Sequence, residues 1–174
     1  AYEQQGRPTG FMVDLVDEAA RSSGTSLRID FYPWARAVAL AQAGPQTLIF
    51  PLARTPERER RFTWVLPLYV QDYVVIAARE TAFVEKGLAP STRVGLIRGT
   101  TLARDLPALR GRPVSDERDY SDLFRKLDEG MIDAIVGPVA IVRASMKLIG
   151  RDPADYRFGP TLGSFELWVA ASID

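Results

Sequence analysis

The sequence predicts an α/β fold, because segments with helical periodicity alternate along the chain with short segments that have the pattern of β-strands. Hydrophobic residues make up 47% of the 174 residues and charged residues 25%, values that are ordinary for a chain that buries a core. The sequence contains no internal repeats and no low-complexity tracts. We therefore expect a globular α/β chain of one domain or two small ones.

The first part of the chain alternates helix and strand patterns that glycine and proline separate. Apolar residues recur at the helical period until Gly24, and residues 27–32 alternate apolar and polar side chains as a half-exposed strand does. Pro33 suits the first turn of a helix. In chain order we expect a helix over 11–23, a strand over 27–32, a helix from 33 to about 43, a buried strand over 47–52 and a single helical turn over 55–62 with Thr55 as its N-cap.

The second part of the chain repeats this alternation. We expect strands over 73–78, 93–97, 132–136 and 165–171, and helices that begin near 102 and span 120–129 and 138–148. These elements divide into one unit over 1–77, which residues 166–174 rejoin, and a second unit over 78–165. Two extended segments, about 73–79 and 165–171, would join the two units.

The composition excludes several classes of function. Lys and Arg together number 22, as do Asp and Glu, so the chain lacks the basic excess that is typical of nucleic-acid-binding proteins. It has no cysteine and no histidine, which removes thiol nucleophiles, disulfides, cysteine-based zinc sites and the commonest general base. We therefore expect no catalytic residues, no metal site and no cofactor. No apolar run approaches the roughly 20 residues of a membrane span.

Five short motifs follow one another along the chain. They are G-R-P-T-G-F-M-V-D-L over 6–15, P-W-A-R-A over 33–37, T-P-E-R over 55–58 with Phe62 and Pro67 behind it, V-G-L-I-R-G-T-T over 94–101, and L-D-E-G-M-I-D-A-I-V over 127–136. In this order and spacing they resemble the family 3 bacterial extracellular solute-binding proteins, the polar-amino-acid receptors of ABC transporters. The resemblance covers almost the whole chain.

The resemblance implies a type II periplasmic-binding-protein fold, in which two α/β lobes joined by two hinge strands close on a ligand. It implies a periplasmic protein with a small-molecule ligand, and ABC transporter membrane subunits as partners. Members of the family begin with a strand before the position of Ala1 and end with a helical segment after the second hinge. We therefore expect the first lobe to be truncated at both ends, and to be completed by further residues or by a second copy of the chain.

Arg58 is the sharpest candidate for ligand binding. By the motif that it closes, it would hold a ligand carboxylate through a bidentate, charge-assisted pair. An ordinary solvated arginine in the charged run 57–61 is the alternative. Thr100 and Thr101 follow Gly99, whose lack of a side chain would let the backbone approach a ligand. They precede a helix, where hydroxyls and free amides bind anions, although a plain helix cap is the alternative.

Three further residues complete the predicted cleft. Trp34 stands at a strand-to-helix turn and would wall the pocket, with packing in the core as the alternative. Ala53 follows a buried strand and would offer backbone groups. Pro138 stands five residues after Asp133, where the resemblance places an aspartate that pairs with the α-amino group of a ligand. Because a proline side chain cannot accept that hydrogen bond, we expect weak or no binding of standard α-amino acids.

We therefore expect a receptor without enzymatic activity that binds a small polar solute, anionic or carboxylate-bearing, between its lobes. A ligand-sensing domain of a membrane sensor kinase, or a regulatory module of a cell-wall lytic enzyme, would have the same fold and a different output. An enzyme is a third hypothesis, since lobed α/β folds also host catalysis. The sequence has no nucleophile elbow to support it.

Overall fold

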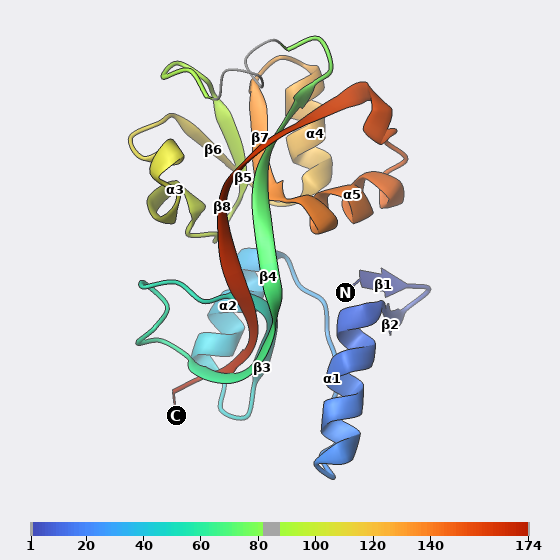
Figure 1. Cartoon of the computed structure of the whole chain (residues 1–174). Coiled ribbons are helices and arrows are strands. Elements are labelled where there is room, and N and C mark those ends of the chain that lie inside the picture. Colours follow the sequence, from blue (N-terminus) through green and yellow to red (C-terminus); the bar gives the residue numbers. More distant parts are fainter. Residues whose placement is uncertain (1, 82–87, 174) are drawn as a thin grey trace.

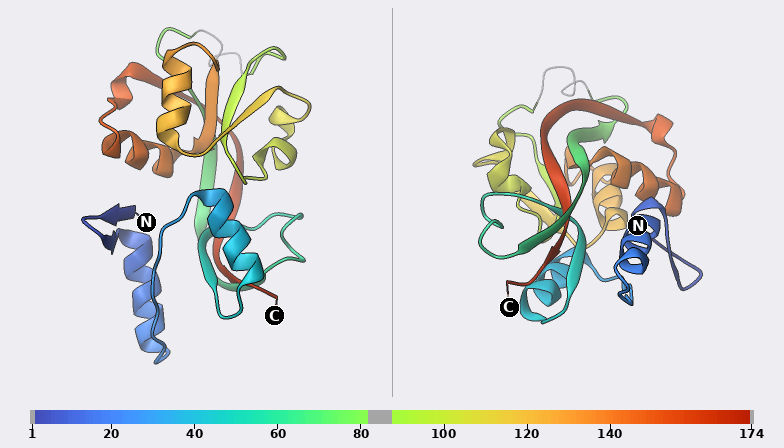
Figure 2. Two further views of the ribbon diagram at one scale, coloured as in Figure 1. Left: turned by 180° about the vertical axis from the view of Figure 1, so that it is seen from behind. Right: turned by 60° about the horizontal axis from the view of Figure 1, so that its bottom comes forward.

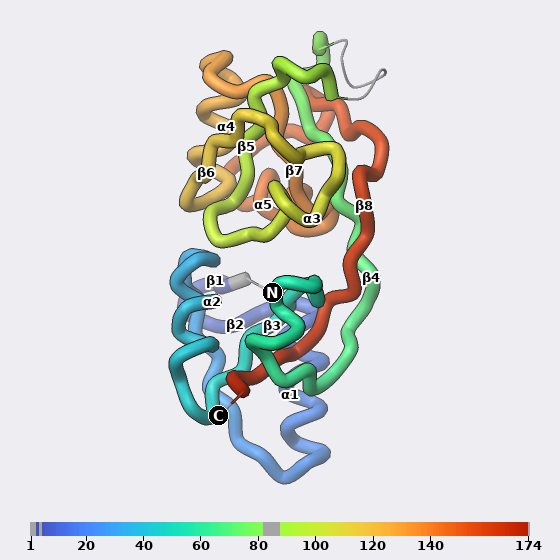
Figure 3. Tube along the Cα trace, turned by 90° about the vertical axis from the view of Figure 1, so that its left-hand side faces the viewer, coloured from blue at the N-terminus to red at the C-terminus, as the bar shows by residue number. Residues whose placement is uncertain are grey.

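Two lobes are joined by a pair of long antiparallel strands in the computed structural model, which describes residues 2–81 and 88–173 (Figure 1). β4 (Thr63–Ala78) and β8 (Tyr156–Ala171) each have 16 residues and pair along their length. In Figure 3 the two strands run along one side of the molecule from one lobe to the other. Both belong to a six-stranded sheet of order β3-β8-β4-β7-β5-β6, so a single sheet continues through both lobes.

The lobe at the top of Figure 1, hereafter lobe 2, is built on short parallel strands. β5 (Val94–Ile97) pairs in parallel with β6 (Val114–Glu117) and with β7 (Ala134–Pro138), and β7 is antiparallel to β4. β7 is buried throughout, because helices cover both faces of the sheet here. The helices of this lobe are α3 (Leu102–Asp105), η2 (Pro107–Leu109), α4 (Tyr120–Asp128), α5 (Val139–Leu148) and η3 (Pro153–Asp155).

Alternate residues of the central strands supply two separate cores in lobe 2. Ile76 of β4 packs with Phe124 of α4 and Met146 of α5 on one face. Val75, the preceding residue, packs with Leu106 beside α3 on the other face. Since successive side chains of a strand point to opposite faces, this apolar run of β4 is explained by burial on both sides.

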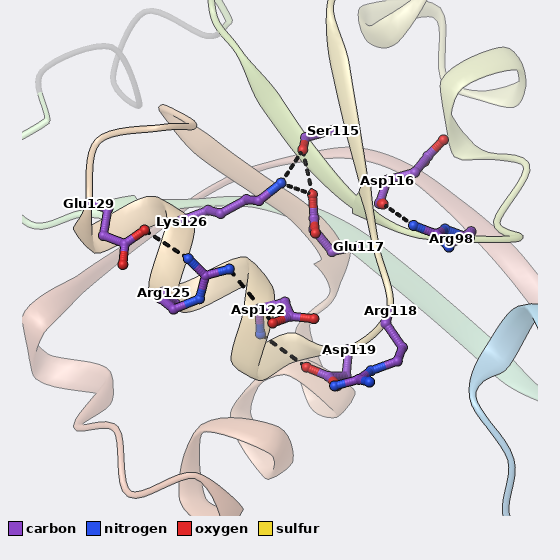
Figure 4. Close-up of polar contacts among 10 residues, drawn as sticks. All are labelled: Arg98, Ser115, Asp116, Glu117, Arg118, Asp119, Asp122, Arg125, Lys126 and Glu129. Atoms are coloured by element: carbon purple, nitrogen blue, oxygen red, sulfur yellow. Dashed lines mark hydrogen bonds and ion pairs between the residues drawn. The ribbon is translucent and has the colours of Figure 1, made fainter.

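Polar contacts fix α4 against β6 (Figure 4). The Asp119 carboxylate accepts a hydrogen bond from the backbone N–H of Asp122 at 3.0 Å, which caps the helix N-terminus. Further along α4, Lys126 Nζ donates to Ser115 Oγ at 3.1 Å and forms an ion pair with Glu117 of β6. These contacts hold the first turn of α4, and with it Tyr120, at the edge of the cleft between the lobes.

The other lobe, hereafter lobe 1, has a smaller core. α2 (Trp34–Ala43) packs on β3 (Leu48–Ala53), which is antiparallel to β8, and the buried side chains include Leu52 and Phe62. Figures 1 and 2 show α1 to one side of the β4–β8 pair, with the hairpin of β1 and β2 at its N-terminal end. The bounds of these elements are Tyr2–Gln4 for β1, Arg7–Thr9 for β2 and Phe11–Ser22 for α1.

Residues 27–32, which the sequence predicts as a strand, form none in the structure, so this prediction is wrong. The chain from 25 to 33 is extended, but residues 26–32 make no backbone hydrogen bond with any described residue. A strand requires a partner, and no described strand pairs with this segment. β3 likewise pairs on one side only, with β8. An open edge of this kind is what a truncated lobe 1 would produce, and the truncation stays a prediction.

The two predicted hinge strands are the ends of longer strands. β4 begins ten residues before Tyr73 at Thr63, and β8 begins at Tyr156. Pro67 in β4, and glycine and proline in the first half of β8, obscure the strand pattern of these extensions. The hairpin of β1 and β2, and β6, are also additional to the predicted elements. The single helical turn predicted over 55–62 is a hydrogen-bonded turn and not a helix, and the other predicted helices and strands form within a few residues of their expected bounds.

Candidate ligand-binding cleft

A cavity of about 790 Å³ lies between the lobes and extends into lobe 1. Its inter-lobe part is lined by residues of both lobes, and its other end runs between the extended segment 26–32 and β3. The cavity brings together six of the seven residues that the sequence proposed for ligand binding: Trp34, Ala53, Arg58, Thr100, Thr101 and Pro138. Gly99 adjoins this set through the hydrogen bond described next.

Arg58 lies at the junction of the two lobes and is 5% exposed. Its Nη1 donates to the Ala53 carbonyl and its Nη2 to the Gly99 carbonyl, each at 3.2 Å. The guanidinium carbon lies 5.9 Å from the ring centroid of Trp34. The solvated alternative for Arg58 is therefore wrong. The carbonyls of Ala53 and Gly99 are used to hold this side chain.

The charge of Arg58 has no counterion at close range. No carboxylate of the described residues lies within 4 Å of its guanidinium. Burial lowers the pKa of Arg58, and the nearby Tyr73 and Asp105 act in the opposite direction. The group stays charged at any ordinary pH. Two carbonyls occupy two of its five N–H donors, so three remain for a ligand.

Three polar groups around the cavity are buried without a hydrogen-bond partner among the described residues: Trp34 Nε1, Thr55 Oγ1 and Thr100 Oγ1. A buried donor or acceptor without a partner costs roughly 1–3 kcal/mol. Groups of this kind in a cavity wall are supplied with partners when a polar ligand enters. The structure therefore places unused hydrogen-bonding capacity beside the unpaired charge of Arg58.

The predicted helix caps do not form. Thr101 is the N-cap residue of α3 and makes no side-chain cap hydrogen bond, and α3 is a single turn. Thr55 begins a hydrogen-bonded turn, in which the Arg58 N–H donates to the Thr55 carbonyl at 2.9 Å, but the Thr55 hydroxyl caps nothing. The backbone and not the hydroxyl of Thr55 thus shapes the turn that carries Arg58.

Backbone contacts also join the lobes beside the cavity. Gly99 has a φ of +84°, and a Cβ built there would lie 2.8 Å from the Ala35 Cα. A glycine is required for both reasons, since other residues rarely adopt this φ and a side chain would collide with α2. Close by, Glu57 of lobe 1 forms an ion pair with Arg104 of α3. The lobes are therefore in direct contact around Arg58.

Sequence reasoning missed three aromatic residues in the wall of the inter-lobe part of the cavity: Tyr73, Tyr120 and Phe165. Tyr73 and Phe165 form an edge-to-face pair with ring centroids 5.3 Å apart. Burial raises the pKa of Tyr73 to about 12, and it also raises the pKa of Tyr120. Neither hydroxyl has a hydrogen-bond partner among the described residues. Their position in the sequence could have indicated Tyr73 and Phe165, because each begins a predicted hinge segment.

Two properties of the described ranges 2–81 and 88–173 bear on metal binding and on membrane insertion. No group of three or more Asp, Glu, His or Cys side chains is placed to hold a metal ion there. No helix of those ranges is long and apolar enough to cross a membrane.

Comparison with protein families identifies the chain. The profile of the bacterial extracellular solute-binding proteins, family 3, matches residues 1–145. The chain belongs to this family. The family resemblance inferred from the motifs is thereby confirmed, and so is the solute-binding receptor class to which the family belongs. A search of curated proteins found no match.

Solved structures of solute-binding proteins have the same fold. Holo ArgBP from T. maritima is 23% identical, with a TM-score of 0.81 over 98% of this chain and 76% of that chain. An ancestral arginine-binding protein bound to glutamine is 19% identical, with a TM-score of 0.82 over 98% and 77% of the two chains. The substrate-binding protein of an amino acid ABC transporter is 19% identical, with a TM-score of 0.80 over 99% and 78%. The predicted type II periplasmic-binding-protein fold is confirmed.

Proposed function

We propose that this family 3 chain is a periplasmic receptor that binds a small carboxylate-bearing solute between its lobes and delivers it to the membrane subunits of an ABC transporter. The observation that supports the proposal is the buried guanidinium of Arg58, which faces a cavity lined by both lobes and pairs with no carboxylate of the described residues. An unpaired buried charge is costly, and a ligand carboxylate would remove that cost through charge-assisted hydrogen bonds.

The proposed ligand lacks the α-amino group of a standard amino acid. Pro138 lines the cavity where the family motif would place an amino-binding aspartate. The charged residues among the described lining are Arg28, Asp30 and Arg58. Asp30 pairs with Arg28 at 2.9 Å in an exposed position at the lobe 1 end, so it leaves the inter-lobe part without a carboxylate. A ligand ammonium bound there would lose its hydration without gaining a carboxylate to pair with.

The first prediction concerns Arg58→Ala. We expect a thermal-shift screen of small carboxylates to find a stabilising ligand, which at 100 times its Kd adds about 2.7 kcal/mol to the free energy of unfolding. Calorimetry should then show that Arg58→Ala weakens binding at least about tenfold, since a charge-assisted hydrogen bond contributes roughly 1.5–3 kcal/mol.

The matched control is Arg60→Ala, which removes the same charge from the same turn at an exposed position. It should leave the affinity unchanged. The proposal is wrong if the folded Arg58→Ala variant binds within twofold of the parent chain, or if standard amino acids bind more tightly than every carboxylate without an amino group.

A further inference from the structure

The inter-lobe part of the cavity is lined by aromatic side chains from both lobes and from the strands that connect them. Trp34 of α2 comes from lobe 1 and Tyr120 of α4 from lobe 2, while Tyr73 of β4 and Phe165 of β8 lie on the connecting strands. Trp34 Nε1 is buried without a hydrogen-bond partner among the described residues, and Tyr73 and Tyr120 each carry a hydroxyl. The walls are therefore flat apolar faces with donors at their edges, a combination that suits a flat ligand with polar atoms at one end.

The polar groups in this part of the cavity are donors or hydroxyls. Arg58 and Trp34 Nε1 can only donate, and the hydroxyls of Thr100, Tyr73 and Tyr120 can donate to an anion. Burial raises the pKa of both tyrosines, so their hydroxyls keep their protons at neutral pH and remain available as donors. Such a set satisfies a ligand whose polar atoms are mainly acceptors, and it offers no strong acceptor to a cation.

Aromatic side chains lie close to Arg58, whose charge would bind the ligand carboxylate. The Arg58 guanidinium lies over Trp34 at 5.9 Å, and Arg58 and Tyr73 are close enough for each to shift the pKa of the other. Tyr73 in turn contacts Phe165 edge to face at 5.3 Å. A carboxylate bound to Arg58 would therefore have Trp34 and the Tyr73–Phe165 pair among the aromatic neighbours of its attached group.

Resting on the proposed function, we infer that the ligand is an aromatic carboxylate without an amino group, of the benzoate, phenylacetate or 3-phenylpropionate class. Arg58 binds the carboxylate, with Thr100 and the tyrosine hydroxyls as further donors. Trp34 and Phe165 contact the ring. A saturated or linear chain would bury similar apolar area, but it would lose the offset and edge-to-face contacts that aromatic side chains favour.

The test is calorimetry with matched acids at neutral pH: 3-phenylpropionate, 3-cyclohexylpropionate, nonanoate and L-phenylalanine. We expect 3-phenylpropionate to bind at least about fivefold more tightly than the cyclohexyl compound, a ratio that corresponds to one or two aromatic contacts. L-Phenylalanine has the same ring and carboxylate with an added ammonium, and should bind at least about tenfold more weakly than 3-phenylpropionate.

Two variants test whether the aromatic side chains of the cavity cause the preference for the aromatic acid. Phe165→Leu should reduce the ratio between the aromatic and the saturated acid to about one, while Phe158→Leu, which changes a phenylalanine of β8 outside the cavity, should preserve it. Trp34→Leu serves the same purpose if Phe165→Leu does not fold, as judged by circular dichroism and a thermal melt.

Each outcome separates this inference from the proposed function. If nonanoate or the cyclohexyl acid binds as tightly as 3-phenylpropionate, and Arg58→Ala abolishes that binding, the carboxylate receptor stands and the aromatic ligand is wrong. The same conclusion follows if folded Phe165→Leu and Trp34→Leu both retain the full ratio. If L-phenylalanine binds most tightly, or if none of the acids and no other small carboxylate binds, the proposed function is wrong as well.

Discussion

At the scale of single residues, the site depends on side chains and backbone groups whose roles are set by contact between the lobes. Arg58 was identified from its motif, but the sequence contained nothing that showed its two carbonyl partners. One of them, Gly99, was predicted to approach a ligand. In the structure its carbonyl accepts from Arg58 and its Cα faces Ala35 of the opposite lobe. Gly99 therefore takes part both in the contact between the lobes and in holding Arg58, the residue proposed to bind the ligand.

The second prediction follows from this position. Gly99→Ala should lower the free energy of unfolding by about 1–2 kcal/mol, because alanine is strained at a φ of +84°. It should also weaken binding of the carboxylate ligand about tenfold or more, since the added Cβ pushes Ala35 away and displaces the carbonyl that holds Arg58. Chemical denaturation and calorimetry measure the two effects.

Gly111→Ala is the matched control for backbone strain. Gly111 has a φ of +71° with nothing within 4 Å of an added Cβ, so its replacement should destabilise the fold to a similar extent and leave the affinity unchanged. Equal loss of affinity in both variants would show that strain alone, and not the contact between Gly99 and Ala35, affects binding.

At the scale of secondary-structure elements, a network of charged groups joins α4 to β6 and so positions Tyr120 at the cleft (Figure 4). Hydrogen bonds from Lys126 and Ser115 lower the pKa of Glu117 below its ordinary value of 4.5. The folded state therefore binds a proton at Glu117 less readily than the unfolded chain. The stabilisation is complete above the ordinary pKa and is lost as the pH falls below it.

The third prediction is that the free energy of unfolding falls as the pH is lowered through about 4.5, and that part of this fall is absent in Glu117→Gln. At pH 7 the variant should be less stable by about 1 kcal/mol, because a hydrogen bond to a charged group is weakened. Urea denaturation at several pH values measures both quantities. An unchanged pH profile in the variant would contradict the assignment of Glu117 as a contributor.

The open edge of lobe 1 is the second feature at this scale, and it leads to the fourth prediction. Backbone amides of residues 26–32 have no hydrogen-bond partner among the described residues, whereas those of β4 from 73 to 77 lie in a buried ladder with strands on both sides. Hydrogen exchange should therefore be fast in 26–32 and slow in 73–77.

A strand that pairs with residues 26–32 should reduce the difference in hydrogen exchange between 26–32 and 73–77. In the truncation hypothesis for lobe 1, a chain extended before Ala1, or association of two copies, would give the 26–32 segment a partner and slow its exchange. Slow exchange of 26–32 in the monomeric 174-residue chain would contradict the open edge.

At the scale of the whole molecule, local pattern predicted the element types and the family, and long-range geometry supplied the rest. Two of the parallel strands of lobe 2, β5 and β7, were found because each is a short apolar run bounded by glycine or a helix pattern, whereas β6, with the sequence V-S-D-E, was not found. The full lengths of β4 and β8 were not found, because Pro67 and the glycines of β8 interrupt the alternation, and pairing between residues 78 to 108 positions apart restores the strands. Tyr120 was missed because it is the first residue of a helix and no recognised motif surrounds it. The strand at 27–32 was predicted because apolar and polar residues alternate there. It does not form, because no described strand pairs with the segment.

Contact between the lobes is the remaining property of the whole molecule, and Arg104 gives a way to alter it without touching the cavity. Arg104 of α3 pairs with Glu57 of lobe 1, while Glu57 also contacts Arg61 at 3.6 Å, so Arg104→Ala breaks the contact between lobes and leaves Glu57 a partner. The Arg104 side chain is 67% exposed. An exposed ion pair contributes roughly 0.2–1 kcal/mol, so the closed arrangement should lose only that much relative to an open one.

The fifth prediction is that Arg104→Ala weakens binding of the carboxylate ligand about two- to fivefold, because a ligand that requires both lobes binds less tightly when fewer molecules are closed. Small-angle scattering should show a larger radius of gyration without ligand, and saturation with ligand should restore the parent value. Arg125→Ala, which breaks an exposed pair with Glu129 within α4, is the control and should change neither measurement. If both variants weaken binding equally, the loss reflects net charge. If neither does, the pair between Glu57 and Arg104 plays no part in closure.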